Sequence, residues 1–174
     1  DGVHLRIGAK GKAAEEAWSK IRPVELAMDE IFGSAIWGKD DDTFEGRIAD
    51  LMIERQATLS SMESCTAGLF ASTICDVSGA SEYFMGGLVT YQTQEKINAG
   101  VSGETIAQYG VYSQETARAM AEACRARFKT EYAVGITGVA GSEPVEGTPP
   151  GTVHIAIDSA HGPGIVSTIV VNQG

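Results

Sequence analysis

Apolar residues follow two different spacings that alternate along the chain. Short apolar runs such as 132–137 are typical of buried strands, whereas the stripe after Ser113 recurs every three or four positions and predicts a helix. Strands alternating with helices indicate a three-layer α/β/α sandwich with a mixed sheet. The other predicted strands are 58–62, 86–91, 153–157 and 165–171, and the predicted helix caps are Asp42 (paired with Glu45), Thr93, Ser102 and Ser113.

The first 43 residues form a separate pattern. Val3, Leu5 and Ile7 alternate with polar residues and predict a strand, and a helix is expected over about 13–32, kinked or restarted at Pro23. Residues 35–37 predict a second short strand, and the acidic run that ends at residue 42 marks a boundary. We therefore expect a small α+β fragment at 1–43 and a larger domain at 44–174.

Charge and composition limit the kinds of molecule that the protein is expected to bind. The net charge of −10 repels phosphate backbones and argues against general nucleic-acid binding, although a local phosphate pocket remains compatible with it. Three cysteines without metal-binding spacing indicate reduced thiols and a cytoplasmic location. No apolar run is long enough for a membrane span, and no zinc or EF-hand pattern is present, so neither membrane nor metal is expected.

Ser64 is the best candidate nucleophile, because it lies where a predicted strand meets a helix and backbone N–H groups can stabilise an anion. A serine needs a base, and Lys96 leaves the next strand in a position to return to the same rim. Tyr91 is expected to hydrogen-bond both side chains. The structural alternatives are that Ser64 only caps its helix, that Lys96 is a surface charge and that Tyr91 is a core ring.

Two further segments offer chemistry. Cys65 is a rival nucleophile, since a thiol at a helix N-terminus is acidified, but a buried small hydrophobe is the alternative. The run 137–141 can bring backbone N–H groups to a phosphate or ribose, although it is not a Walker A loop. The expected substrate-binding residues are Cys65, Thr66, Gly86, Gly87, Thr137, Gly138, Ala140 and Gly141.

Five ordered motifs together resemble the C-terminal domain of the CinA (competence/damage-inducible protein) family. They are the runs 63–68, 87–91 with Lys96, 110–113, 137–141 and 150–153. The resemblance implies hydrolysis of the carboxamide of nicotinamide mononucleotide by Ser64, with Lys96 as the base and Tyr91 assisting, in a cytoplasmic homodimer without a cofactor. Residues 1–43 are similar to the family's small linker domain, and the large N-terminal domain of full-length members is not in this sequence.

Three departures from the family pattern bear on this expectation. Ala67 replaces a glycine and is expected to be tolerated if that backbone is helical, and Thr148 replaces a lysine, which is expected to weaken contact with an anionic ligand. Family members continue past the last residue with a Gly-Asp-Arg segment and a closing helix. The alternatives are a catalytically weak nucleotide-binding or scaffold domain and a cysteine hydrolase that uses Cys65.

Overall fold

The computed structural model of the protein describes residues 3–171, and its contacts divide the chain into residues 1–47 and 48–174. The predicted boundary after residue 43 assigns all of helix α2 (Phe44–Glu54) to the second domain, whereas the division by contacts falls inside this helix. Each unit has its own set of elements.

The first unit contains one long helix, α1 (Ala14–Phe32), followed by the 3₁₀ turn η1 (Gly33–Ala35). The helix agrees with the predicted span and continues through Pro23 without a break. The strands predicted at 3–7 and 35–37 are both wrong, because neither segment pairs with another strand. An extended segment becomes a strand only when a neighbour satisfies its backbone hydrogen bonds, and no described residue of this unit does so.

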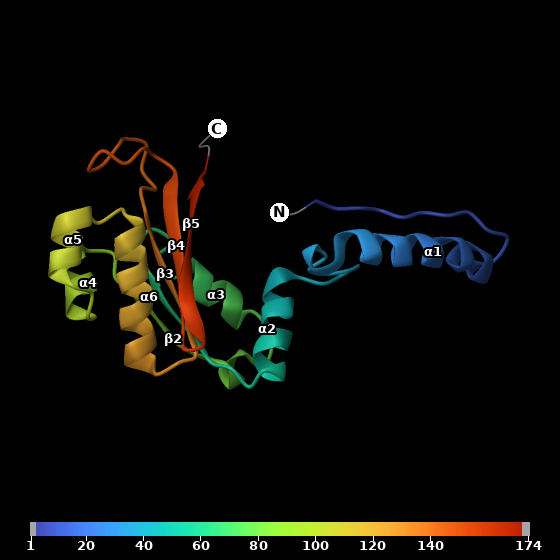
Figure 1. Ribbon diagram of the computed structural model, residues 1–174, viewed down its shortest axis with the longest axis horizontal. Coiled ribbons are helices and arrows are strands. Elements are labelled where there is room, and N and C mark those ends of the chain that lie inside the picture. The colour runs from blue at the N-terminus through green and yellow to red at the C-terminus, as the bar shows by residue number, and fades with distance from the viewer. Residues whose placement is uncertain (1–2, 172–174) are drawn as a thin grey trace. The chain divides into compact units, whose positions relative to one another are not determined.

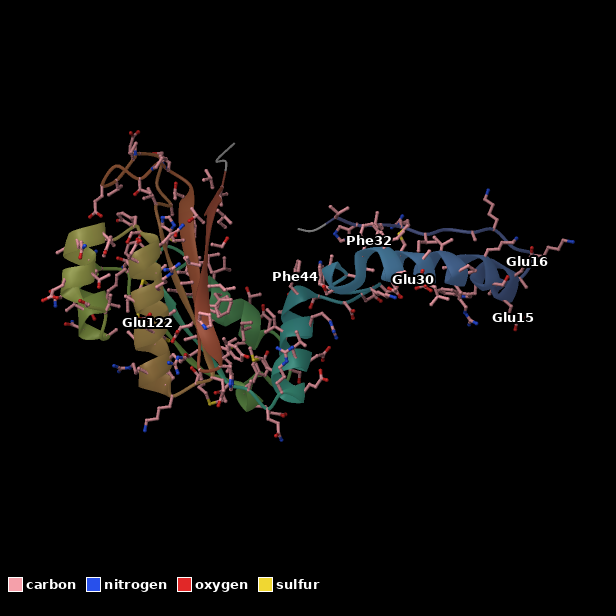
Figure 2. All side chains as sticks on the ribbon, in the orientation of Figure 1. Glu15, Glu16, Glu30, Phe32, Phe44 and Glu122 are labelled. Carbon is pink, nitrogen blue, oxygen red and sulfur yellow. The ribbon has the colours of Figure 1, made fainter. Side chains whose placement is uncertain are left out.

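Helix α1 has no buried residue, so the first unit has little core of its own. Its apolar stripe stays open, with Ile31 71% exposed and Trp18 51% exposed. Glu15 and Glu16, both labelled in Figure 2, lie in the first turn of the helix, where negative charge interacts favourably with the helix dipole.

The second unit is built on a five-stranded mixed sheet with the strand order β2-β1-β3-β4-β5. Strand β1 pairs in parallel with β2 and β3, while β3, β4 and β5 pair antiparallel, so the predicted mixed sheet and terminal hairpin are confirmed. The strands are β1 (Leu59–Glu63), β2 (Phe84–Val89), β3 (Tyr132–Gly138), β4 (Thr152–Ser159) and β5 (Gly162–Val170). The helices are α3 (Leu69–Cys75), η2 (Ala80–Glu82), α4 (Thr93–Asn98), α5 (Gly103–Tyr109) and α6 (Gln114–Phe128).

Helices cover both faces of this sheet (Figure 1). Helix α6 lies on one face, with α4 and α5 on the same side, and Met62 of β1 packs there in one core with Met120. Helix α3 covers the other face, where Leu59 and Ile74 share a second core. Successive residues of a strand face opposite sides, so β1 contributes to both cores. The predicted three-layer α/β/α sandwich is confirmed.

Two of the four predicted helix caps are confirmed. Ser102 and Ser113 each accept the backbone N–H three residues further on, at 3.3 and 3.1 Å. Thr93 is the first residue of α4 and caps nothing. Asp42 does not cap α2 either, because its carboxylate accepts the N–H of Lys39 and the hydroxyl of Thr43 takes the capping position instead.

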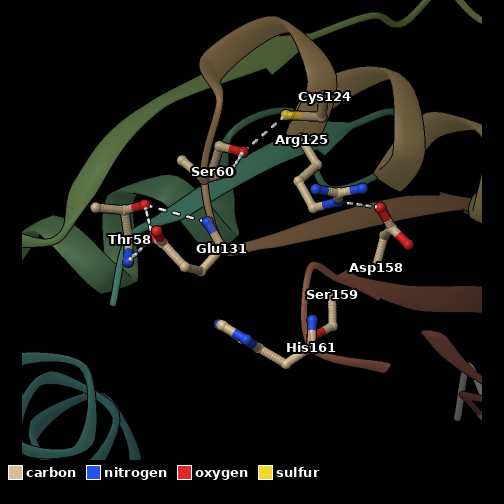
Figure 3. A network of polar contacts seen from close by, with 9 residues as sticks. Thr58, Ser60, Cys124, Arg125, Glu131, Asp158, Ser159 and His161 are labelled. Atoms are coloured by element: carbon tan, nitrogen blue, oxygen red, sulfur yellow. Dashed lines mark hydrogen bonds and ion pairs between the residues drawn. The ribbon is translucent and has the colours of Figure 1, made fainter. Parts of the chain in front are cut away.

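A polar network ties the strands together at the edge where β1 and β3 begin (Figure 3). The Glu131 carboxylate accepts the N–H of Thr58 at 2.8 Å and also its hydroxyl, and these bonds lower the pKa of Glu131. Arg125 of α6 forms an ion pair with Asp158 of β4. This edge therefore serves to fasten the sheet, and the chemistry expected from the sequence lies at the opposite edge.

Candidate active site

Ser64 directly follows β1, at the edge where the parallel strands end. Its backbone N–H donates to the carbonyl of Ile136 in β3 at 2.9 Å, and the carbonyl of Glu63 accepts the N–H of Thr90 at 2.8 Å. These two bonds hold the residue between the ends of β3 and β2. Open α/β sheets bind ligands at such carboxyl ends.

The Lys96 ammonium group of α4 reaches this point. Lys96 is 0% exposed, and its Nζ lies 2.9 Å from Ser64 Oγ, 2.7 Å from the carbonyl oxygen of Thr90 and 3.2 Å from that of Tyr91. The sequence expectation that these two side chains meet is therefore met. The alternative of a surface lysine is wrong. Ser64 does not cap α3, whose N-cap is Gly68.

Nζ of Lys96 donates to three oxygens, the carbonyls of Thr90 and Tyr91 and Ser64 Oγ. When the group loses a proton, the two carbonyls can hold its two remaining N–H bonds, and its lone pair is then directed at Ser64 Oγ. Burial lowers the pKa of Lys96, because removal from water disfavours the charged form. A lysine in this state can accept the proton of a serine hydroxyl.

The Tyr91 side chain does not take the position that the sequence suggested. The residue is 64% exposed, and no described residue receives a hydrogen bond from its hydroxyl. Its contribution to the site is its backbone carbonyl, which accepts from Lys96. The side-chain hydrogen bonds expected from Tyr91 to Ser64 and Lys96 are therefore absent. The alternative that Tyr91 is a core ring is also wrong, because the ring is exposed.

The turn from Ser64 to Gly68 holds two backbone N–H groups that bond to no oxygen of the described residues and lie against the Cys65 sulfur. Among the described residues, the N–H groups of Cys65 and Thr66 have no oxygen acceptor, whereas those of Ser64 and Ala67 are bonded within the chain. They follow the nucleophile directly, as oxyanion donors commonly do. Burial raises the pKa of the Cys65 thiol, which disfavours the thiolate that a cysteine nucleophile requires.

Thr90 is a residue that the sequence reasoning missed. Its carbonyl makes the shortest contact to Lys96, and its buried hydroxyl, like that of Thr66, has no hydrogen-bond partner among the described residues. A buried, unpartnered hydroxyl requires an explanation, and a bound water or substrate provides one. A role played by a backbone carbonyl leaves no mark in the sequence pattern.

Gly86 and Gly87 have a packing role inside β2. A Cβ on Gly86 would lie 2.7 Å from the ring of Phe128, and one on Gly87 would lie 2.7 Å from Ser61 Oγ. These contacts give both glycines a packing reason, and their expected part in substrate binding stays a prediction.

The end of β3 lies beside Ser64, whose N–H is bonded to Ile136. Thr137 is buried and donates its hydroxyl to the carbonyl of Val111 at 3.0 Å, and Gly138 allows β3 to approach the Thr152 carbonyl, which a Cβ would meet at 2.5 Å. Gly141 has open space around it, and it is exposed together with Ala140. Only these last two residues of the expected binding run face solvent at this edge.

The loop 142–151 is hydrogen-bonded to the segment between α5 and α6. The Glu146 carboxylate accepts the N–H of Val111 at 2.9 Å. Thr148, at the position where a lysine is usual, donates its hydroxyl to the Tyr112 carbonyl at 3.5 Å and pairs with Val145 through the backbone. The loop therefore carries an acidic side chain here and no cation.

Ala67 is not helical, so the expected reason for tolerating it is wrong. Its φ is +50°, and that of the following Gly68 is +98°. Side chains with a Cβ adopt the left-handed region only at a cost, which a glycine avoids.

We expect Ala67→Gly to stabilise the protein by about 1 kcal/mol, because glycine adopts this left-handed conformation without the Cβ penalty. Urea unfolding measures the change. Ala126→Gly is the matched control, since Ala126 is exposed in α6, where a glycine lowers stability. Destabilisation by both substitutions would contradict the left-handed turn.

The described residues contain no group of three or more His, Cys, Asp or Glu side chains arranged to hold a metal ion. A groove of about 270 Å³ lies beside the site and is lined by Thr90, Glu95 and Arg127, among others, but not by Ser64. Within residues 3–171, no helix combines the length and the apolar character that crossing a membrane requires.

The fold and the site define an α/β domain with a buried serine-lysine pair at the carboxyl ends of its parallel strands. A family model described as the CinA C-terminal domain matches residues 41–173. The chain therefore belongs to the CinA family.

Individual relatives agree with this assignment. A CinA-like protein of Frankia casuarinae is 42% identical over 161 residues, which cover 92% of this chain and 37% of that protein. A CinA-like protein of Rippkaea orientalis is 36% identical over 164 residues, covering 92% and 39%. The crystal structure of a competence-damaged protein (CinA) superfamily protein from Escherichia coli has a TM-score of 0.71 at 28% identity, covering 82% of this chain and 86% of that one. The chain thus spans less than half of the two CinA-like relatives.

Proposed function

We propose that this chain is a serine-lysine amidase domain that hydrolyses the carboxamide of nicotinamide mononucleotide to nicotinate mononucleotide and ammonia. The observation that carries the proposal is the 2.9 Å contact between Lys96 Nζ, which is fully buried, and Ser64 Oγ. The substrate comes from the family resemblance, and the chemistry comes from the geometry of the pair.

In the first step, Lys96 takes the proton of Ser64 and Ser64 Oγ attacks the carboxamide carbon. The N–H groups of Cys65 and Thr66 stabilise the oxyanion. The tetrahedral intermediate collapses, the C–N bond breaks, and Lys96 returns its proton to the leaving ammonia. An ester between Ser64 and the nicotinoyl carbon remains.

In the second step, water attacks the ester while Lys96 accepts a proton from it. The Ser64–acyl bond then breaks, Lys96 returns this proton to Ser64 Oγ, and the carboxylic acid leaves. The carbonyls of Thr90 and Tyr91 hold the lysine nitrogen in place throughout. We assign part of the nucleotide to the exposed end of the run 137–141, next to Ser64. Neither of these two reaction steps uses a cofactor.

Ser64→Ala tests the proposal. We expect the rate of ammonia release from nicotinamide mononucleotide to fall by at least about 1000-fold, because the acyl intermediate can no longer form. Ser72→Ala is the matched control, since Ser72 is exposed on α3 and outside the site. Undiminished activity in Ser64→Ala would refute the mechanism, and absence of activity in the wild type would favour the scaffold alternative.

The cysteine alternative has its own test. Cys65→Ser is expected to retain activity, since the proposed contribution of this residue is its backbone N–H; complete loss would favour the thiol as nucleophile.

Assembly as a homodimer and a cytoplasmic location are further proposals from the family resemblance, and analytical ultracentrifugation measures the first of them.

A further inference from the structure

We propose that Glu63 is the positioning residue that holds the nucleophile turn in its reactive shape, an inference that rests on the proposed role of Ser64. Its side chain is 1% exposed. One carboxylate oxygen accepts the N–H groups of Gly68 and Phe70 at 3.1 and 3.0 Å, and the other accepts that of Ala71 at 2.9 Å. Among the described residues, no cation forms an ion pair with this carboxylate.

The turn between β1 and α3 needs such an anchor. Ala67 and Gly68 are both left-handed, with φ of +50° and +98°. An L-residue in this region persists only where surrounding bonds hold it there. The Glu63 carboxylate binds Gly68 itself and the chain just after it, so it fixes the path by which the chain leaves Ser64.

The other backbone N–H groups of the turn differ in whether they are hydrogen-bonded. Ser64 donates to Ile136, Ala67 donates to Ser64, and Leu69 donates to Thr66. Glu63 occupies the N–H groups of the next positions, 68, 70 and 71. The N–H groups of Cys65 and Thr66, directly after Ser64 in the chain, bond to no oxygen among the described residues and lie against the Cys65 sulfur.

A carboxylate is required for this task, because it is the side-chain group that offers acceptor sites on both atoms and no donor. A glutamine in the same place would turn an NH₂ group toward at least one backbone N–H. The turn would then rearrange, and Ser64 Oγ would move relative to Lys96 Nζ and to the N–H groups of Cys65 and Thr66. A displacement of about 1 Å at such a site lowers the rate by about 100-fold.

Glu63→Gln tests the inference through the reactivity of Ser64 itself. A fluorophosphonate probe forms a Ser64 Oγ–P bond while the P–F bond breaks, fluoride leaves, and the serine proton passes to Lys96. We expect the labelling rate and kcat for the nucleotide to fall by about 100-fold, with KM within about threefold of wild type. The rates are measured where circular dichroism shows folded protein, so that a purely structural effect would lower Tm without slowing the labelling of folded molecules.

Glu82→Gln is the matched control, because Glu82 is exposed and outside the site, and it should label at the wild-type rate. Labelling of folded Glu63→Gln within threefold of wild type would overturn the inference while leaving the proposed nucleophile intact. Failure of the wild type both to label at Ser64 and to release ammonia would instead overturn the proposed function and this inference with it.

Glu63→Asp decides the matter if the glutamine variant does not fold. It keeps the charge but is one methylene too short to reach all three donors, so a reduced labelling rate is expected and wild-type labelling would overturn the inference. Hydrogen exchange on the wild type needs no variant. The amides of Gly68, Phe70 and Ala71 should exchange more slowly than those of Cys65 and Thr66, and equally fast exchange in both sets would overturn it.

Discussion

Replacing Lys96 by methionine is expected to slow ammonia release by at least about 1000-fold while leaving the domain at least as stable as the wild type. Activity falls because no other described side chain within hydrogen-bonding distance of Ser64 Oγ can take its proton. Stability is retained because methionine fills a similar volume without a buried amine, whose charged form burial disfavours. An amidase assay and urea unfolding measure the two effects.

The stability difference should depend on pH. Burial lowers the pKa of Lys96 from its ordinary value of 10.5, so between the folded pKa and 10.5 the unfolded chain binds more protons than the folded chain. The stability of the wild type therefore rises with pH across this window. The advantage of Lys96→Met is greatest below the folded pKa and disappears above about 10.5, and the amidase rate of the wild type should rise through the same folded pKa.

Two further variants serve as comparisons for Lys96→Met. Lys96→Arg should be as inactive as Lys96→Met, since a guanidinium stays charged and cannot accept the proton. Lys12→Met, at an exposed position of the first unit, should change neither property. A Lys96→Met enzyme that works at the wild-type rate would show that another group is the base.

Gly135→Ala is expected to destabilise the second unit by about 3 kcal/mol. A Cβ at this position of β3 would lie 2.2 Å from the carbonyl oxygen of Ala117 and 2.6 Å from the backbone nitrogen of Ala121. Both atoms belong to the backbone of α6, so the helix must move away from the sheet and loosen the core around Met120. The midpoint of urea unfolding measures the loss.

Gly162→Ala provides the comparison, because a Cβ there meets nothing within 4 Å. Its stability should remain within about 0.5 kcal/mol of wild type. Equal stability of Gly135→Ala and Gly162→Ala would mean that α6 does not approach β3 as closely as described.

The periodic parts of the fold could be predicted from the sequence. The apolar stripe after Ser113 predicted α6, because this helix buries one consistent face. The apolar run 132–137 predicted β3, because this strand is buried along almost its whole length. The strand predicted at 3–7 does not form, although apolar and polar residues alternate there. A strand needs a neighbouring strand to pair with, and the local pattern does not show whether one exists. Leu69 of α3 is apolar and yet 65% exposed, because a short helix gives too few positions to define its buried face.

The site was predictable in part. The contact between Ser64 and Lys96, 32 residues apart, followed from placing both at the carboxyl ends of neighbouring strands. The orientation of Tyr91 and the left-handed backbone at Ala67 did not follow, since both depend on how the chain turns after a strand ends. The roles of the Thr90 carbonyl and of the Glu63 carboxylate became visible only from their hydrogen bonds.

The central claim is that a buried, uncharged amine meets the Ser64 hydroxyl, and a titration of the lysine side chains followed by carbon-13 NMR tests it most directly. The resonance missing from Lys96→Met identifies the group. We predict that it loses its proton below pH 10.5, in a step that also changes when Ser64 is replaced by alanine. A Lys96 that titrates at or above 10.5, and is indifferent to Ser64, would contradict the account.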